Sequence, residues 1–164
     1  MRPALRLGVR VGVDVGTVRV GVAASDPGGI LATPVATLRR GKGDQAELVR
    51  LAQEREAVEV VVGLPRTLRD REGAAAADAA AYAQRLADSL PAVPVRLVDE
   101  RLSTVTAQRD LRATGVGARK GRSVVDQAAA VIILQSALDQ ERASGVPPGR
   151  TVAASPGVDA KVEE

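Results

Sequence analysis

The residues that could do chemistry in this chain are limited by two absences. The sequence of 164 residues contains no His and no Cys. Without them there can be no Ser-His-Asp or Cys-His arrangement, no imidazole general base and no ordinary zinc ligand set. Carboxylates, Lys, Arg, hydroxyls and one Tyr remain. Carboxylates holding a hard cation are therefore the leading option for an enzyme, because oxygen ligands suit Mg²⁺ or Mn²⁺.

The first candidate ligand is Asp14, which lies in an expected strand between Gly12 and Gly16. Side chains alternate along a strand, so these three residues share one face. Two glycines beside the carboxylate would leave open space for a ligand or metal. Alternatively, the glycines serve tight packing and a turn, and Asp14 is merely an acid near that turn. The pattern alone leaves both interpretations open.

A second acidic position follows the expected strand 93–98. Asp99 and Glu100 stand at its carboxyl end, where open α/β sheets bind ligands. Adjacent residues on an extended chain point to opposite sides, so we expect only one of the two to join Asp14. The alternative is that they stabilise the N-terminus of the next helix through its dipole.

Asp126 is the third candidate, and it also has a structural explanation. Ser123 followed by Asp126 matches a capping box at the start of a helix. The same position places a carboxylate on the first turn of a mostly apolar helix, from which it could face the ligand end of the sheet. Position in the sequence does not decide between the two roles.

Periodicity indicates the elements that must position these acids. The segment 9–24 reads as two β-branched strands meeting at Gly16-Thr17, and 31–38 reads as a third strand, giving an antiparallel meander. Helical and strand patterns then alternate, which favours parallel pairing with right-handed crossovers. In chain order they are a helix opened by a capping-box-like Asp44 and Glu47, a strand at 57–63, a helix at 73–90, a strand at 93–98, a helix from Ser103 or Thr104 to about 113, and a helix from Ser123 to about Arg142.

Length and composition predict one cytoplasmic domain. We expect an N-terminal extension at 1–8, a domain at 9–142 and a disordered tail rich in Pro, Gly, Ser and Ala at 143–164. The longest apolar run, 128–134, is far too short to span a bilayer, and the N-terminus has no apolar signal region. Absence of Cys fits a reducing compartment.

Basic residues indicate a polyanionic partner. The chain has 23 Lys and Arg against 20 Asp and Glu, and almost no aromatic residues, so contacts to nucleic acid would be made to phosphates and shape. Two loops next to the expected acids, 65–71 and 115–122, mix basic residues with turn residues; the alternative is that both are solvated turns. The candidate substrate-binding residues are Arg19, Arg66, Arg69, Arg101, Arg119, Lys120 and Arg122, of which Arg19 and Arg101 could instead pair with the acids.

Four sequence blocks, in this order and spacing, resemble the YqgF family, also called RuvX-like. They are Gly12-Val13-Asp14-Val15-Gly16 with Arg19, Gly21-Val22-Ala23 and Ser25-Asp26; Val61-Val62-Gly63-Leu64-Pro65; Asp99-Glu100-Arg101-Leu102-Ser103-Thr104; and Lys120 through Asp126 to Ala128-Ala129. The match covers roughly residues 9–140.

The resemblance implies an RNase H-like α/β fold, with a five-stranded mixed sheet and helices on both faces. It also implies that Asp14, Glu100 and Asp126 converge as catalytic acids and metal ligands. The family is assigned to 5′-end processing of pre-16S ribosomal RNA and, in some accounts, to resolution of Holliday junctions. Resolvases of the RuvC type use four acids, whereas the position three after Asp126 is Ala129, so a tight two-metal site has one ligand fewer here.

The sequence therefore predicts a nuclease that uses Mg²⁺ or Mn²⁺ and acts on pre-ribosomal RNA more readily than on branched DNA, as a monomer or homodimer without a membrane partner. Two other functions stay open. A non-catalytic factor could bind ribosomal RNA during assembly. A phosphate-binding ATPase of the actin type would share the core fold and a first phosphate loop like residues 14–17, but it needs two such domains.

Overall fold

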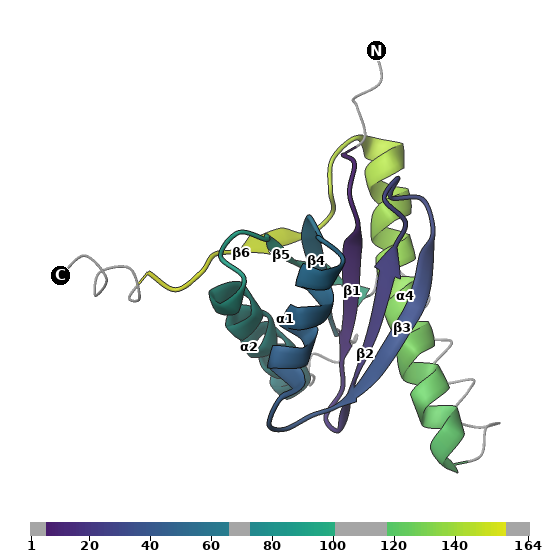
Figure 1. Cartoon of the computed structure of the whole chain (residues 1–164), viewed down its shortest axis with the longest axis vertical. Coiled ribbons are helices and arrows are strands. Elements are labelled where there is room, and N and C mark those ends of the chain that lie inside the picture. Colours follow the sequence, from purple (N-terminus) through teal and green to yellow (C-terminus); the bar gives the residue numbers. More distant parts are fainter. Residues whose placement is uncertain (1–5, 66–72, 101–117, 157–164) are drawn as a thin grey trace.

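The computed structural model describes residues 6–65, 73–100 and 118–156, with side chains in the last range from residue 127 onward. Strands and helices alternate after an initial run of three strands (Figure 1). The elements are β1 (Arg10–Val15), β2 (Arg19–Ser25), β3 (Ala32–Arg39), α1 (Asp44–Glu54), β4 (Glu59–Leu64), α2 (Gly73–Ser89), β5 (Val95–Asp99), α4 (Ala118–Ser144) and β6 (Arg150–Val152). The expected helix from 103 to 113 lies outside the described residues.

One mixed sheet joins the described strands in the order β3-β2-β1-β4-β5-β6. β1 pairs antiparallel with β2, and β2 with β3, so the predicted meander is confirmed. β1 pairs parallel with β4, and β4 with β5, which confirms the parallel pairing expected from the alternation of strands and helices. β1 therefore lies inside the sheet, with its carboxyl end beside that of β4.

The predicted count of five strands is wrong, because the sheet has six. β6 lies within the segment 143–164 that the composition predicts to be disordered, and it pairs antiparallel with β5 from Val95↔Val152 to Leu97↔Arg150. Its three residues are mostly exposed and show no hydrophobic alternation. The unpaired backbone N–H and C=O groups at the edge of β5 form hydrogen bonds with this segment. Such pairing does not require a hydrophobic side-chain pattern, so the sequence does not reveal it.

Helices cover both faces of the sheet, as predicted (Figure 1). On one face, α1 and α2 pack on the sheet through Leu48, Tyr82 and Leu86, all fully buried. On the other face α4 packs through a stripe of residues at helical spacing that includes Ala130, Ile133, Leu134 and Ala137. A residue of the sheet can therefore be assigned to one face or the other by whether it contacts α4 or contacts α1 and α2.

Two of the predicted helix caps are wrong, and the cap expected at Ser103 or Thr104 lies outside the described residues. Gly43 is the N-cap residue of α1, and Asp44 instead accepts a hydrogen bond of 2.9 Å from the buried Tyr82 hydroxyl. α4 begins at Ala118, well before Ser123, so much of the expected basic loop 115–122 is helical and Asp126 is not part of a capping box. A single Gly121 costs a helix only about 1 kcal/mol, which the long buried stripe offsets.

None of the helices in the described part of the chain combines the length and the apolar character that a membrane span requires.

Candidate functional site

Asp14 lies on the face of the sheet that α4 covers, and only 3% of its surface is exposed. Gly12, two residues earlier on the same face, touches that helix: a β-carbon added there would lie 2.7 Å from Leu134 Cβ and 3.1 Å from the Ala130 carbonyl oxygen. The expected open space beside Asp14 is therefore filled at Gly12 by α4. This glycine allows close helix packing, so the packing alternative is the correct one at this position.

Gly16 serves the turn between β1 and β2. Its N–H donates to the Arg19 carbonyl oxygen at 2.9 Å, and an added β-carbon would lie 2.7 Å from the same oxygen. The turn spans residues 16–18, one residue longer than the Gly16-Thr17 connection that the sequence indicated. Both glycines around Asp14 are thus explained by packing and turn geometry.

Glu100 directly follows β5 and is as buried as Asp14, with 3% exposed. Its Cγ lies 3.3 Å from the position that a β-carbon on Gly63 would occupy, and Ile133 Cδ1 of α4 lies 2.6 Å from that position. Glu100 therefore leans over Gly63 on the same face as α4. A larger residue at position 63 would push its carboxylate or the helix aside.

Gly63 also adjoins Asp14. Val13 pairs with Val62 across the parallel β1–β4 pair, so the same register carried one residue further sets Asp14 beside Gly63. Neighbouring strands lie about 4.8 Å apart. Asp14 and Glu100, which are 86 positions apart in the sequence, consequently flank one glycine from its two sides.

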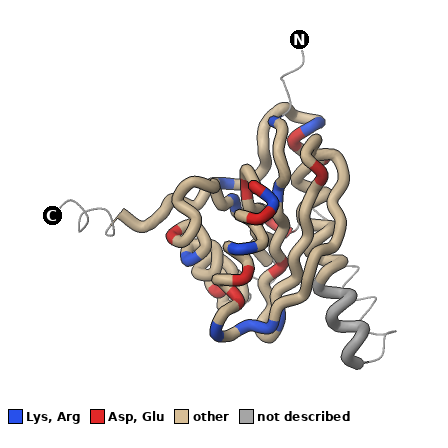
Figure 2. Tube along the Cα trace, viewed as in Figure 1, with Lys and Arg blue, Asp and Glu red and all other residues tan. Residues whose placement is uncertain are grey.

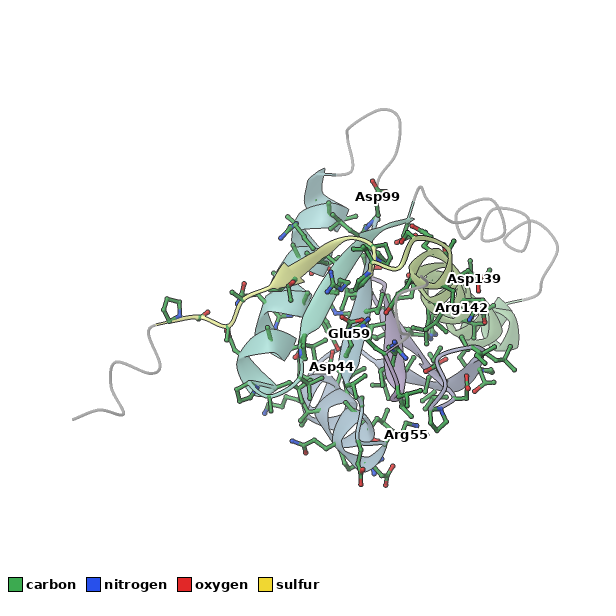
Figure 3. All side chains as sticks on the ribbon, turned by 90° about the horizontal axis from the view of Figure 1, so that it is seen from above. Asp44, Arg55, Glu59, Asp99, Asp139 and Arg142 are labelled. Atoms are coloured by element: carbon green, nitrogen blue, oxygen red, sulfur yellow. The ribbon has the colours of Figure 1, made fainter. Side chains whose placement is uncertain are left out.

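Asp99 lies at the end of β5, opposite Leu64 of β4 in the register (Figure 3). It is half-buried, and of the two adjacent acids only Glu100 appears beside Gly63. Within the parts of the chain that the structure describes, no cluster of three possible acidic ligands occurs. The side chain of Asp126, the third predicted ligand, lies outside the described residues.

The turn of α4 that contains position 126 can nevertheless be located from its neighbour. Gln127 Nε2 donates to Thr37 Oγ1 of β3 at 3.0 Å. Thr37 is in register with Gly21 of β2, and Gly21 is in register with Asp14 of β1. This turn of the helix therefore crosses the row of the sheet that contains Asp14.

The predicted substrate-binding residues are described only in part. Arg19 begins β2, is half-buried and is in register with Arg39 of β3. The others, Arg66, Arg69, Arg101, Arg119, Lys120 and Arg122, have side chains outside the described residues.

Sequence reasoning from single strands missed one residue and one contact at this site. In the sequence, Gly63 was recognisable only as a member of the second sequence block. Its lack of a side chain leaves room for Glu100, and this contact depends on the pairing of β4 with β5. Thr37 and Gln127 show no pattern that would have linked them before the fold was known, since they are 90 positions apart.

The fold is that of RuvC. The structure titled "T. thermophilus RuvC in complex with Holliday junction substrate" aligns with a TM-score of 0.58 over 88% of this chain and 99% of that chain, at 14% identity. A second Thermus thermophilus RuvC structure aligns with a TM-score of 0.52 over the same shares. The predicted RNase H-like class of α/β fold is thereby confirmed.

Sequence comparison identifies the family within that class. Residues 8–140 match RuvX, described as Holliday junction resolvase. A protein of Streptomyces coelicolor is 57% identical over 152 residues, 92% of this chain and 91% of its own length. One from Mycobacterium sp. strain KMS is 61% identical over 145 residues, 87% of this chain and 86% of its own. Both relatives bear the name "Putative pre-16S rRNA nuclease". The chain belongs to the RuvX family.

Proposed function

We propose that this protein is a divalent-metal-dependent endonuclease that hydrolyses phosphodiester bonds during 5′-end processing of pre-16S ribosomal RNA. One observation supports the chemistry above all: two buried carboxylates, Asp14 and Glu100, flank Gly63 at the carboxyl ends of neighbouring strands. Buried acids at that edge of an α/β sheet are typical of a ligand site rather than of a core.

The donor set suits Mg²⁺ or Mn²⁺. Asp14 and Glu100 provide hard oxygen donors, and the chain has no His or Cys to offer a softer cation. Asp126 is the proposed third ligand, since the α4 turn that holds it crosses the row of Asp14. A bound cation of this kind lowers the pKa of water and offsets the charge of the scissile phosphate.

The protein's own contribution is to hold these acids in a fixed position. Asp14 is fixed by strand pairing on both sides, to Gly21 and beside Gly63. Glu100 has limited freedom because Ile133 of α4 closes the space over Gly63. Positions set by rigid elements keep the ligand geometry precise.

The substrate follows from the relatives. Those that are 57% and 61% identical bear a name for pre-16S RNA nucleases, which favours RNA. The description of the family favours a second candidate, resolution of four-way DNA junctions. We further propose that the protein works in the cytoplasm, as a monomer or homodimer, with residues 9–142 as the nuclease domain.

The test is cleavage of two labelled substrates, a pre-16S 5′-leader RNA and a four-way DNA junction, with Mg²⁺, with Mn²⁺ and without metal. Wild-type protein should cleave the RNA only when metal is present. Asp14→Asn and Glu100→Gln should each abolish cleavage with little change in thermal stability, because each keeps the shape of the side chain while removing a charged ligand.

Asp99→Asn is the matched control, since it removes an adjacent carboxylate that does not adjoin Gly63, and it should cleave like wild type. Full activity in Asp14→Asn would refute the site. Binding of the leader RNA by wild-type protein with no cleavage under any metal condition would favour a non-catalytic assembly factor instead.

A further inference from the structure

Two arginines face each other directly at the edge of the sheet next to the proposed acids. Arg19 opens β2 and Arg39 closes β3, and the two are register partners in the antiparallel pair. Like charges in directly opposed positions destabilise a sheet. Stability therefore gives no reason for this pair, whereas an anion bound between the two side chains would.

These two arginines differ from most others in the described part of the chain, where arginines such as Arg6, Arg40 and Arg96 make ion pairs with carboxylates. Among the described residues, no carboxylate pairs with Arg19, Arg39 or the nearby Lys42. Arg39 and Lys42 are also exposed to solvent. Cations left without a protein partner at one edge are available to an external anion.

The segment 41–43, shortly after Arg39, is exposed to solvent and has free space on both sides of Lys42. Lys42 stands between Gly41 and Gly43, whose φ angles of +142° and +95° are strained for other residues. Nothing lies within 4 Å of a β-carbon added to either glycine. Figure 2 shows blue tube in the loop at the lower left, where β3 leads into α1.

Arg40 fixes this segment to the turn that follows Asp14. Its backbone N–H donates to the Val18 carbonyl oxygen at 2.8 Å, and its Nη1 donates to the Gly16 carbonyl oxygen at 3.1 Å. The same guanidinium pairs with Asp78 of α2 at 2.5 Å. Arg40 thus holds its neighbour Arg39 beside the turn that joins the strand of Asp14 to the strand of Arg19, and Lys42 follows two residues later.

The distance from Arg19 and Arg39 to Asp14 follows from the register. Asp14, Gly21 and Thr37 form one row across β1, β2 and β3. Arg19 and Arg39 lie two residues further along their strands on the same face, about 7 Å from Gly21 and Thr37. Because neighbouring strands lie about 4.8 Å apart, the backbone of Arg19 lies about 8 Å from that of Asp14, and the backbone of Arg39 about 12 Å from it.

We propose that Arg19, Arg39 and Lys42 form a phosphate-binding edge that takes the sugar-phosphate backbone of the nucleic acid next to the scissile bond. This inference rests on the proposed nuclease function and adds a binding surface to it. Arg39 and Lys42 are the new members, while Arg19 keeps its predicted role in substrate binding and shares it with Arg39.

The experiment measures binding of the pre-16S 5′-leader RNA and of the four-way DNA junction by fluorescence anisotropy across a range of NaCl concentrations. Asp14→Asn protein serves as the non-cleaving background. Adding Arg39→Gln should weaken binding about fivefold and make the dependence of log Kd on log salt shallower by about 0.7 to 0.9 for the lost phosphate contact. The nucleic acid that shows the larger change is the one whose backbone follows this edge.

Arg150→Gln in the same background is the matched control. Arg150 is also an exposed arginine without an ion pair among the described residues, but it lies on β6, at the opposite edge of the sheet and opposite Leu97. It should leave both Kd and salt slope unchanged. Arg39→Lys should restore most of the affinity, and Arg39→Gln should melt at the same temperature as its parent or slightly higher, because a repulsive pair is lost.

Equal Kd and equal salt slope for Arg39→Gln and Arg150→Gln would overturn the phosphate-binding edge. If wild-type protein still cleaves the leader RNA in that case, the nuclease function stands and only this surface is wrong. If wild-type protein neither binds nor cleaves either nucleic acid, the proposed function and the edge both fail.

Discussion

The two ends of the central sheet use their charges in different ways. At the end where β1 and β4 begin, Arg6 Nη2 lies 3.0 Å from Glu59 and 2.7 Å from Glu141, and Arg96 Nε lies 2.9 Å from Glu59. At the other end, Arg19, Arg39 and Lys42 pair with no carboxylate among the described residues, although the row of Asp14 lies only two residues away along β2 and β3. Figure 2 shows red and blue side by side near the N-terminus, and mainly blue where β3 leads into α1.

This difference separates charges that pair within the fold from those that we propose bind phosphate. Buried charges that satisfy one another within the fold contribute to orientation of the chain and need no ligand. The paired cluster ties the N-terminal segment, the sheet and the end of α4 together through Glu59 and Glu141. Charges that the protein gathers and leaves without a partner are those that an external phosphate can use.

The largest effect on stability is expected at the paired end. Glu59→Gln removes a carboxylate that is 3% exposed, leaves Arg96 without its ion-pair partner and leaves Arg6 with Glu141 alone, so the free energy of unfolding should fall by about 3 kcal/mol. Urea denaturation measures this change. Metal-dependent cleavage at a temperature where the variant is folded should stay at the wild-type level, because the cluster lies at the far end of β4 from Gly63.

Glu54→Gln is the control for that change, since it removes an exposed carboxylate that pairs with Arg50 on the surface of α1. It should alter stability by less than about 0.5 kcal/mol. If Glu59→Gln lowers the free energy of unfolding as little as Glu54→Gln does, the charges at this end of the sheet are not structural, and the two ends do not differ in the way described.

Substitutions at two glycines that contact α4, Gly12 and Gly63, should have effects of intermediate size on stability. Gly12→Ala would drive a β-carbon against Leu134 Cβ and the Ala130 carbonyl, both fixed by the helix backbone, and should destabilise the protein by about 2–3 kcal/mol. Gly63→Ala meets the movable end of Ile133 and Glu100 Cγ, so it should cost less stability. It should nevertheless raise the Mg²⁺ concentration needed for half-maximal cleavage, by moving a ligand.

Thermal melting and a Mg²⁺ titration of cleavage separate the two variants. If Gly12→Ala shifts the metal requirement as much as Gly63→Ala does, packing of α4 as a whole controls the site, and Gly63 has no special part in placing Glu100.

The smallest effect is a dependence of stability on pH. The hydrogen bond from Arg6, with the charges of Arg6 and Arg10, lowers the pKa of Glu141 below its ordinary value of 4.5. A carboxylate with a lowered pKa stabilises the fold fully above the unfolded value, and this contribution is lost as the pH falls through the folded one. Wild-type stability should therefore decline below about pH 4.5, and Glu141→Gln should decline less steeply there.

Denaturation curves between pH 3 and pH 6 give the measurement. Parallel pH profiles for wild type and Glu141→Gln would show that Glu141 gains no stabilisation from its arginines, contrary to its place in the paired cluster.

Much of the fold was predictable because its signals are local. The strand patterns around Asp14 and before Asp99, and the Ala-rich helix with Tyr82, agree with β1, β5 and α2. β6 was not predictable, since three exposed residues join β5 through backbone hydrogen bonds alone. The start of α4 was misplaced at Ser123 because a good cap residue inside a helix looks the same in the sequence as one at its end.

The sequence by itself determined the available chemistry: without His or Cys, carboxylates and cations are left, and their types favour a hard metal and a phosphate. Tertiary structure decided which of them meet. That Asp14 and Glu100 share Gly63, and that Arg19 faces Arg39, depends on the register between strands distant in sequence. Side-chain periodicity reveals the two faces of one strand, but register is set by long-range pairing, and only the folded chain contains it.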